Sequence, residues 1–493
     1  MAETEKTSDS RRPWTWVFAF LMALAVGLRL WNAAASSLKL DDFHSLHHAR
    51  AADSATFFRV LREDNHPPLS FLLVRITRAL LGESEWALRT PALVAGLLTL
   101  LVAWRLACRL PCAGGRAAAL CLLACSSLHM ELSSDVRMYA LLALAVTGFL
   151  EALVAVLEEG RGQLRAILWC VAGLHAHYHF LYAVSLLGAG ALLLALRVPA
   201  YRARVAPLLR ILGTSALLSL PWYALAFPHQ LAHGLSPGGS DATVPRLLEG
   251  WVHLVFLNVS SAGPFLRGLW LLAGALLLAQ AGLGTWSLWR RAAPERPAFP
   301  LLLALSAFGI PVLTWAASTL SPRAGFEWRY LGGALSAFAL LAGTEACAAG
   351  AWSRARRCAL FFVCASAAGL AVQNARDPGE EDYRGAVRWI LEHASAGDAV
   401  VAADWQPQLF PHAIGWSYYA PRLARGELPA LLEYRDDFSL ADPAELDGRA
   451  RVFCCFRSLK DECGILRLLR ERYPREDVLL FGRSIYVHVF TRS

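Results

Sequence analysis

Apolar segments of about 20 residues recur along most of this chain, which is the length that a helix needs to cross the hydrocarbon core of a bilayer. By this criterion we count about eleven segments, at 14–32, 90–109, 116–131, 138–157, 164–176, 178–196, 207–227, 264–289, 298–319, 329–350 and 356–373. Composition agrees, because 56% of the 493 residues are hydrophobic and 17% are charged, which is unusual for a soluble protein. The sequence therefore predicts an α-helical polytopic membrane protein.

Arginines in the short connections predict the orientation of these segments. A formal net charge of +8 would also suit nucleic-acid binding. The positive-inside rule explains the charge better, since cytoplasmic loops of membrane proteins are rich in arginine and lysine, so we expect no nucleic-acid partner. The arginines assigned to the cytoplasmic side are Arg11, Arg12, Arg105, Arg109, Arg116, Arg161, Arg165, Arg197, Arg202, Arg204, Arg290, Arg291, Arg354, Arg356 and Arg357.

The apolar run from Pro67 to Leu81 is not expected to span the membrane. It is short, it carries Arg75 and Arg78, and its leucines recur at helical spacing. We predict an amphipathic helix in the membrane interface that starts at the two prolines, which the first turn of a helix tolerates. Counting this run as a span would invert every later loop. With the run left outside, the connections at 40–85, 133–137, 175–179, 227–263 and 321–328 and the chain after Arg376 are extracytoplasmic.

The first extracytoplasmic loop begins with two adjacent carboxylates, Asp41 and Asp42. We expect the preceding segment to stay attached as a helix, although 32–36 also resembles a signal-peptide cleavage site. Adjacent side chains point in different directions, so one of the two faces a given reacting atom. A single carboxylate suits an inverting sugar transfer, in which a base takes the proton of an acceptor hydroxyl. The alternative is a solvated acidic loop.

Further charged groups lie at other predicted extracytoplasmic helix ends. Asp135 and Arg137 are two residues apart in HMELSSDVRMYALL, either as part of the same site or as an ion pair at a helix start. A lipid-phosphate leaving group needs cationic or hydrogen-bonding neighbours. The candidates are His66, Arg137, His177, His179, Arg323 and Arg329. The HAHYH histidines alternate, which gathers metal ligands on a strand and not in a turn between helices, so we expect no metal or cofactor site.

The order of these motifs resembles that of a known family. LDDFHS, then NHPPLSFLLVRITRALLGESEWALRTPALVAGLLTLL, SSDVRMYALLALAV, HAHYHFLYAVSLL and WRYLGGALSAFALLAG are similar to the bacterial membrane glycosyltransferases related to protein O-mannosyltransferases and aminoarabinose transferases. These proteins have the GT-C fold of glycosyltransferase family 39 in the broad sense. The likeness is strong over residues 14–200, thinner to residue 350, and general in the tail.

The resemblance implies a role for each candidate residue. Asp41 takes the position of the proposed base, and Asp42 takes the position of a glutamate that usually follows. Asp135 stands where the family usually has glutamate in a Q-E-A-R-M-Y-like motif, which Arg137 and Tyr139 match directly. His66 begins the family's H-P-P-L motif. The donor would be a sugar on a polyprenyl monophosphate, with Arg329 near its phosphate and the active site at the outer face of the inner (plasma) membrane; the acceptor would be a lipid, a glycan or a protein.

Two regions follow a different pattern from the apolar segments. The long loop at 227–263 is either a lid or a plain connection, and Asn258-Val259-Ser260 matches a glycosylation acceptor. The sequence predicts a transmembrane domain at 1–376 and a small extracytoplasmic α/β domain at 377–493. In the latter, helices are expected at DYRGAVRWILEHA and KDECGILRLLRERY, and strands at GDAVVAAD, RVFCCF, VLLF and SIYVHVF.

Side chains of the predicted α/β domain leave two alternatives open. A disulfide among Cys454, Cys455 and Cys463 is possible if the domain is extracytoplasmic, whereas most other cysteines are expected to act as small apolar side chains. Four aromatic residues could stack on sugars or form a core: Trp405, Trp416, Tyr418 and Tyr419.

Three classes of function compete for this sequence. An inverting transferase that uses a lipid-linked sugar predicts acidic residues at outer helix ends, as found. A transporter predicts internal repeats and ionisable residues near the middle of the spans. A polysaccharide polymerase or ligase of another membrane fold predicts a long outer loop late in the chain. We favour the transferase.

Overall fold

The structure is a computed structural model that describes residues 12–233, 242–257, 264–292, 297–321, 326–377, 379–403, 413–434, 440–457 and 464–492. It divides into two compact units. The membrane unit comprises Met1–Trp31 and Ala51–Ala375, and the C-terminal unit comprises Asn32–Arg50 and Arg376–Ser493. The sequence analysis did not assign Asn32–Arg50, which contains Asp41 and Asp42, to the same unit as the tail.

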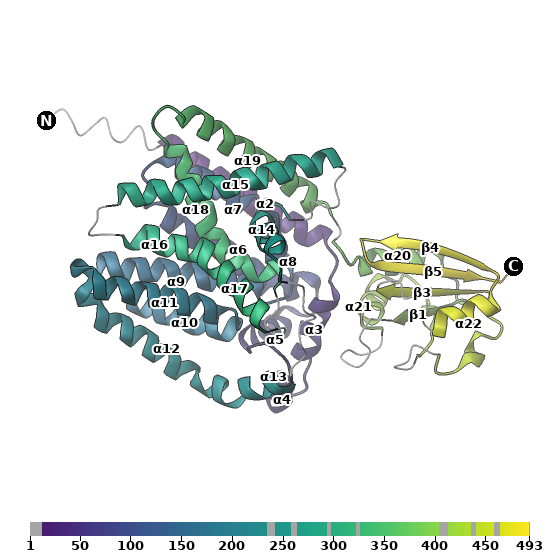
Figure 1. Cartoon of the computed structure of the whole chain (residues 1–493). Helices are drawn as coiled ribbons and strands as arrows, with labels where there is room; N and C mark the ends of the chain where they lie inside the picture. Colours follow the sequence, from purple (N-terminus) through teal and green to yellow (C-terminus); the bar gives the residue numbers. More distant parts are fainter. Residues whose placement is uncertain are drawn as a thin grey trace. The chain divides into compact units, whose positions relative to one another are not determined.

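Helices make up the membrane unit, and Figure 1 shows α9, α10, α11 and α12 running side by side. The helices are α2 (Arg12–Ala35), α4 (Ser54–Glu63), α5 (Leu69–Leu81), α6 (Glu85–Ala107), α7 (Ala113–Ala124), α8 (Ser127–Ser134), α9 (Tyr139–Glu159), α10 (Gln163–Ala176), α11 (Phe180–Arg197), η1 (Pro199–Arg204), α12 (Val205–Leu225), α13 (Phe227–His233), α14 (Val244–His253), α15 (Pro264–Arg291), α16 (Ala298–Ala304), η3 (Leu305–Gly309), α17 (Ile310–Leu320), η4 (Trp328–Ala334), α18 (Leu335–Gly343), η5 (Thr344–Cys347) and α19 (Ser353–Ala375).

Fewer of these helices qualify as membrane spans than the sequence predicted. Within the described residues, nine helical segments are long and apolar enough to cross a bilayer, or ten if α7 and α8, which meet at a 51° bend, form one broken span. The predicted segment at 164–176 forms α10, which has only 14 residues. At about 1.5 Å per residue this helix is shorter than the hydrocarbon core, so nine or ten of the predicted segments qualify as spans by length and composition.

The most apolar helix, α9, lies at the centre of the unit. Its mean hydropathy is 2.4, and every residue from Leu142 to Leu157 is buried. A helix that is apolar on all sides is buried either in a protein core or in a membrane, and the side chains of α9 are buried within the protein itself. It ends at Gly160, whose φ of 73° is the left-handed conformation common after the last helical turn.

The helix predicted at 67–81 is confirmed as α5, and its position in the membrane interface stays a prediction. It begins after Pro68 and has 13 residues. Phe71 and Val74 are buried against the unit, whereas Leu72, Ile76 and Leu80 are exposed. An exposed apolar face of this kind suits a helix in contact with lipid.

The bend between α7 and α8 is stabilised by a buried arginine from α2. The Arg29 guanidinium donates to the carbonyls of Leu123 at 3.0 Å and Ala124 at 3.1 Å, which are the last residues of α7. It also lies 2.5 Å from Nδ1 of His129 in α8. The last carbonyls of a helix have no hydrogen-bond donor within the helix. Arg29 supplies donors to two carbonyls that the break between α7 and α8 leaves without one.

A disulfide joins two segments that are distant in the sequence. Cys112, just before α7, is bonded to Cys347 at the end of η5, with their Cα atoms 5.9 Å apart. The sequence analysis did not predict this pair, because the spacing of two cysteines 235 residues apart does not reveal that they meet.

The C-terminal unit contains α3 (Leu40–Ala49) and a five-stranded sheet of order β2-β1-β3-β5-β4. Strands β1 and β2 and strands β1 and β3 pair in parallel, and the pairs β3–β5 and β4–β5 are antiparallel. The strands are β1 (Ala399–Ala403), β2 (Ala430–Leu431), β3 (Arg451–Arg457), β4 (Arg475–Phe481) and β5 (Ile485–Thr491), and the other helices are α20 (Tyr383–His393), α21 (Ile414–Leu423), η6 (Pro443–Leu446) and α22 (Gly464–Arg472).

Helices cover both faces of this sheet. Leu469 of α22 packs in one apolar core with Val452 and Cys454 of β3, whereas Trp389 of α20 contacts Phe453, with ring centroids 6.2 Å apart. Neighbouring side chains of a strand point to opposite faces, so α20 and α22 lie on opposite sides (Figure 1).

Most predictions for the tail are confirmed. The helices α20 and α22 and the strands β1, β3, β4 and β5 form where the sequence predicted them, whereas α21 and β2 were not predicted. Trp416, Tyr418 and Tyr419 are buried and thus belong to the core. The predictions for Trp405, Cys463, Arg323 and Asn258 fall outside the described residues, so a disulfide that involves Cys463 stays a prediction.

Candidate functional site

Five predicted substrate-binding residues come together in the membrane unit from four separate connections. His66 precedes α5, Arg137 and Tyr139 lie at the turn into α9, His177 lies between α10 and α11, and Arg329 is in η4. The ring centroids of Tyr139 and His177 are 5.6 Å apart, as are those of His66 and His177. The Arg329 guanidinium lies over the Tyr139 ring, 5.3 Å from its centroid.

Tyr330 and His179 complete this cluster. The centroid of the Tyr330 ring lies 4.1 Å from the ring centroid of His179, 5.3 Å from that of His177 and 5.9 Å from that of Tyr139. Tyr330 was not predicted, although it follows Arg329 directly in the quoted motif WRYL. The imidazole, phenol and guanidinium groups together make a polar site that favours an anion.

His177 is the most buried histidine of this cluster, with 4% of its surface exposed. Its Nδ1 accepts a hydrogen bond from the backbone N–H of His179 at 3.0 Å, so the neutral ring carries its proton on Nε2. Burial first, and then the positive charges of His179, His66, Arg137 and Arg329, hold the pKa of His177 well below its usual range. Its Nε2 has no hydrogen-bond partner among the described residues, which leaves a buried N–H donor for a ligand oxygen.

Two glycines bring η4 close to α9 and its neighbours. A Cβ atom on Gly332 would lie 2.6 Å from Leu132, and one on Gly333 would lie 2.8 Å from Val146. Carbon atoms do not approach this closely without displacement. The GG of WRYLGG therefore lets the η4 backbone lie against α9, which places Arg329 and Tyr330 beside Tyr139.

Hydrogen bonds fix the loop that carries His66. The buried Asp64 carboxylate lies 2.9 Å from His66 Nδ1 and forms an ion pair when the ring is protonated. Gln230 of α13 donates to the carbonyls of Leu61 at 2.7 Å and His66 at 3.2 Å, and it accepts a hydrogen bond from Tyr178. The start of the long loop thus supports His66. Whether the rest of this loop acts as a lid stays a prediction, because 234–241 and 258–263 lie outside the described residues.

Asp135 occupies the end of α8, two residues before Arg137. Its backbone N–H donates to the Glu131 carbonyl at 3.0 Å, and its side chain is half-buried. Extended backbone at Asp135 ends α8 and turns the chain toward α9. The structure therefore places Asp135 in the same short connection as Arg137 and Tyr139.

Asp41 and Asp42 lie in the first turn of α3, in the C-terminal unit. Asp42 is 1% exposed, and its Oδ2 accepts a hydrogen bond from the backbone N–H of Lys39 at 2.9 Å. This contact is part of a capping box at the helix start. Asp42 thus has a structural contact at the helix start, and Asp41 is half-exposed.

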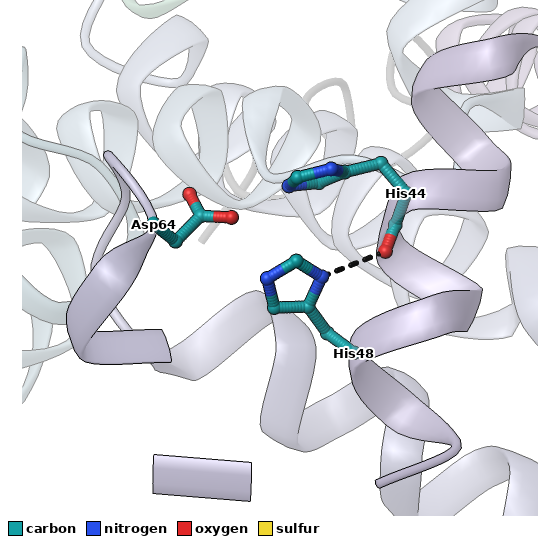
Figure 2. Close-up of side chains that lie close together, drawn as sticks. All are labelled: His44, His48 and Asp64. Atoms are coloured by element: carbon teal, nitrogen blue, oxygen red, sulfur yellow. Dashed lines mark hydrogen bonds between the residues drawn. The ribbon is translucent and has the colours of Figure 1, made fainter. Parts of the chain in front are cut away.

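Two histidines of α3 are one helical turn apart. Figure 2 shows their rings side by side, with centroids 4.3 Å apart, and His48 Nδ1 lies 2.9 Å from the His44 carbonyl. Imidazoles at this spacing suit a divalent cation as well as a hydrogen-bonded substrate. Asp64, which Figure 2 also draws, belongs to the membrane unit.

Comparisons with known proteins agree with this fold. Residues 65–223 match the sequence profile of the family described as dolichyl-phosphate-mannose-protein mannosyltransferase. A comparison with curated proteins finds no matching sequence. Among solved structures, ArnT from Cupriavidus metallidurans in the apo state is similar with a TM-score of 0.54 and 15% identity, over 97% of this chain and 98% of ArnT.

Two ligand-bound structures are similar to the same extent. ArnT from Cupriavidus metallidurans bound to undecaprenyl phosphate has a TM-score of 0.53 and 14% identity, over 96% of this chain and 98% of that one. The archaeal oligosaccharyltransferase AglB from Archaeoglobus fulgidus, in complex with an inhibitory peptide and a dolichol-phosphate, has a TM-score of 0.52 and 11% identity, over 94% of this chain and 71% of AglB. The predicted GT-C fold, with many membrane helices and a small C-terminal sheet domain, is confirmed.

Proposed function

From the fold shared with ArnT and AglB and from the cluster around His177, we propose that this GT-C protein is an inverting glycosyltransferase. It moves a sugar from a polyprenyl-phosphate donor to an acceptor hydroxyl. The observation that carries the proposal is the convergence of His66, Arg137, Tyr139, His177 and Arg329 from four connections of one unit. The fold similarity favours a transferase over the transporter and polymerase alternatives.

The cluster around His177 would hold the donor phosphate. Arg137 and Arg329 supply fixed positive charge, and the neutral His177 supplies the Nε2–H donor. Such groups stabilise the charge that grows on a leaving phosphate while the bond to the sugar breaks. Tyr139 provides an aromatic face for Arg329 and lies beside Tyr330, and His66, held by Asp64, contacts His177.

Asp41 would act as the general base. Its carboxylate takes the proton of the acceptor hydroxyl while the acceptor oxygen bonds to the anomeric carbon of the sugar. The bond between that carbon and the phosphate oxygen breaks, and its electron pair leaves with the polyprenyl phosphate. One displacement inverts the configuration at the anomeric carbon. Asp42 caps α3. Asp135 is a second candidate catalytic carboxylate, two residues before Arg137.

The protein is a multi-pass membrane protein, and we place its reaction at the outer face of the inner membrane. The arginine pattern of the sequence supports this orientation. ArnT in complex with undecaprenyl phosphate and AglB in complex with an inhibitory peptide and a dolichol-phosphate support a lipid-linked donor. The acceptor would be a lipid, a glycan or a protein.

Purified full-length protein in lipid nanodiscs tests the proposal. A panel of undecaprenyl-phosphate sugars is incubated with membrane extract, and transfer is compared between wild type and Asp41→Asn. We expect wild type to transfer one of the sugars and Asp41→Asn to lose at least about 10²-fold in rate, the usual contribution of a general base. Equal transfer by both proteins would exclude Asp41 as the base.

A further inference from the structure

A buried glutamate of the C-terminal unit holds the helix that carries Asp41. Glu381 lies just before α20 and is 5% exposed. One carboxylate oxygen, Oε2, accepts a hydrogen bond from the backbone N–H of Leu40 at 2.6 Å. The other, Oε1, lies 2.6 Å from Nε of Arg457 at the end of β3. Glu381 thus links the central sheet to the start of α3.

The contact with Leu40 satisfies a group that the helix itself cannot. Leu40 is the first residue of α3, and the first N–H groups of a helix have no acceptor within it. A carboxylate at this end is also favoured by the helix dipole. The Asp42 carboxylate accepts a hydrogen bond from the Lys39 N–H in the same way. Two carboxylates, one of α3 and one of the tail, therefore define where α3 begins.

Other residues of the C-terminal unit hold the same segment. The Tyr419 hydroxyl accepts a hydrogen bond from the Leu38 N–H at 2.8 Å. Phe43 packs against three aromatic rings, with centroid distances of 5.6 Å to Tyr383, 5.5 Å to Tyr418 and 6.2 Å to Tyr419. Tyr418 and Tyr419, which the sequence suggested as sugar-stacking or core residues, thus hold α3.

We propose that Glu381 is a positioning residue of the transfer reaction, and that the C-terminal unit holds the catalytic base in place through it. This inference rests on the proposed function, since it assumes that Asp41 is the base. The charged and titratable groups around Glu381 are Arg457, Lys39, Asp41 and, beside Arg457, Tyr383. Burial, and to a lesser extent the charge of Asp41, raise the pKa of Glu381, while Arg457 opposes this shift. Glu381 and Asp41 thus influence one another's ionisation.

Hydrogen–deuterium exchange of the full-length protein tests the hold on α3 without any substrate. Glu381→Ala removes the acceptor of the Leu40 N–H, and we expect at least tenfold faster exchange in a peptide that covers residues 38–46. Glu381→Gln keeps an oxygen at this place, so its exchange should stay close to that of wild type. Unchanged exchange in Glu381→Ala would overturn the proposed hold on α3.

The chain offers a matched control in the same unit. Asp398 is 2% exposed, its Oδ2 accepts a hydrogen bond from the Ser395 N–H at 2.7 Å, and it pairs with Arg451 at 2.8 Å. Asp398→Ala removes the same kinds of contact from a site that does not include α3. It should leave the exchange of residues 38–46 and the pH profile of transfer unchanged.

The pH profile of transfer tests the link to catalysis. Glu381→Gln removes a negative charge that opposes the ionisation of Asp41, so the acid limb of kcat/KM should move to lower pH. Glu381→Ala should lower kcat about tenfold with little change in KM for the donor. If Glu381→Ala does not fold, the pH profile of Glu381→Gln still tests the proposal. An acid limb of kcat/KM at the wild-type position in that variant would overturn it.

The two proposals fail in different ways. Full activity of Asp41→Asn would exclude the base, while slow exchange at residues 38–46 in wild type and fast exchange in Glu381→Ala would still establish the anchoring contact. Loss of activity in Asp41→Asn together with no effect of either Glu381 variant would keep the proposed function and exclude Glu381 as a positioning residue.

Discussion

The ring centroids of Tyr330 and His179 lie 4.1 Å apart, although the two residues belong to segments far apart in the sequence. Tyr330 is in η4 and His179 precedes α11. Their contact brings Arg329 to the turn that carries His177 and to Tyr139 at the start of α9. Substitutions in and around this cluster therefore give the most direct tests of the site.

Arg329→Ala is expected to lower kcat/KM for a lipid-linked donor by about 10²-fold, the usual effect of removing one group that stabilises developing charge. Arg329→Lys should recover only part of this loss, because an ammonium group lacks the planar fork that binds a phosphate through two hydrogen bonds. Steady-state kinetics with the active donor would measure both. Arg290, whose guanidinium lies 5.2 Å from the Trp286 ring centroid, is the control, and Arg290→Ala should retain wild-type kinetics.

His177 should make the fold sensitive to acid. Its pKa is depressed in the folded protein, so below about pH 6.5 the unfolded chain binds a proton that the folded chain does not. The contribution of His177 to the free energy of unfolding is therefore fully present above about pH 6.5. It falls as the pH drops, by up to about 1.4 kcal/mol per pH unit. His177→Gln removes this titration, so its Tm should fall less than that of wild type between pH 7.5 and 5.5.

The exposed His393 is the control for this measurement. His393→Gln should follow the wild-type dependence of Tm on pH. A His177→Gln variant that loses as much Tm as wild type on acidification would contradict the assignment of a buried neutral imidazole.

Asp64→Asn is expected to reduce kcat about tenfold, because it removes the charge that orients His66 through the 2.9 Å contact. KM for the donor should change less than kcat if His66 acts mainly while charge moves to the phosphate. The neighbouring Glu63 is exposed, so Glu63→Gln serves as the control and should have normal kinetics. Equal kcat for Asp64→Asn and wild type would show that the pair has no catalytic effect.

Arg29→Met should destabilise the membrane unit. The carbonyls of Leu123 and Ala124 would lose their donor, and each buried carbonyl without a partner costs about 1–3 kcal/mol. The expected result is a lower Tm in detergent and weaker protection of α7 and α8 from exchange. Arg210 is exposed and has a 3.4 Å contact to Gln163, so a similar loss of Tm in Arg210→Met would mean that the effect is not specific to Arg29.

Local sequence patterns were enough to predict most helices and strands. The apolar segments, the prolines before α5 and the short runs of β-branched and aromatic residues in β3 and β5 each reflect preferences that act over a few residues. Among the segments predicted to span the membrane, α10 differs, because an apolar run predicted a span but the helix has only 14 residues. Hydropathy measures how apolar a segment is, whereas the length of the helix depends on where the chain turns.

The sequence predicted single residues of the candidate site but not the contacts between them. Sequence reasoning identified His66, Arg137, His177 and Arg329 as cationic or hydrogen-bonding groups at predicted outer helix ends. The family resemblance added Tyr139. It did not identify Tyr330, which follows Arg329 in WRYL, or Asp64, which lies two residues before His66. Their contribution is visible only from ring distances and the ion pair with His66.

The sequence by itself determined that the chain has a membrane part and a polar tail, because burial in lipid or in water depends on composition over about 20 residues. Only the tertiary structure decided which distant residues meet: Cys112 with Cys347, His179 with Tyr330, and Leu40 with Glu381. Such pairs depend on the packing of whole helices and strands, whose contacts leave no local pattern in the chain. For this reason the attachment of α3 to the C-terminal unit could not be predicted from the loop that contains it.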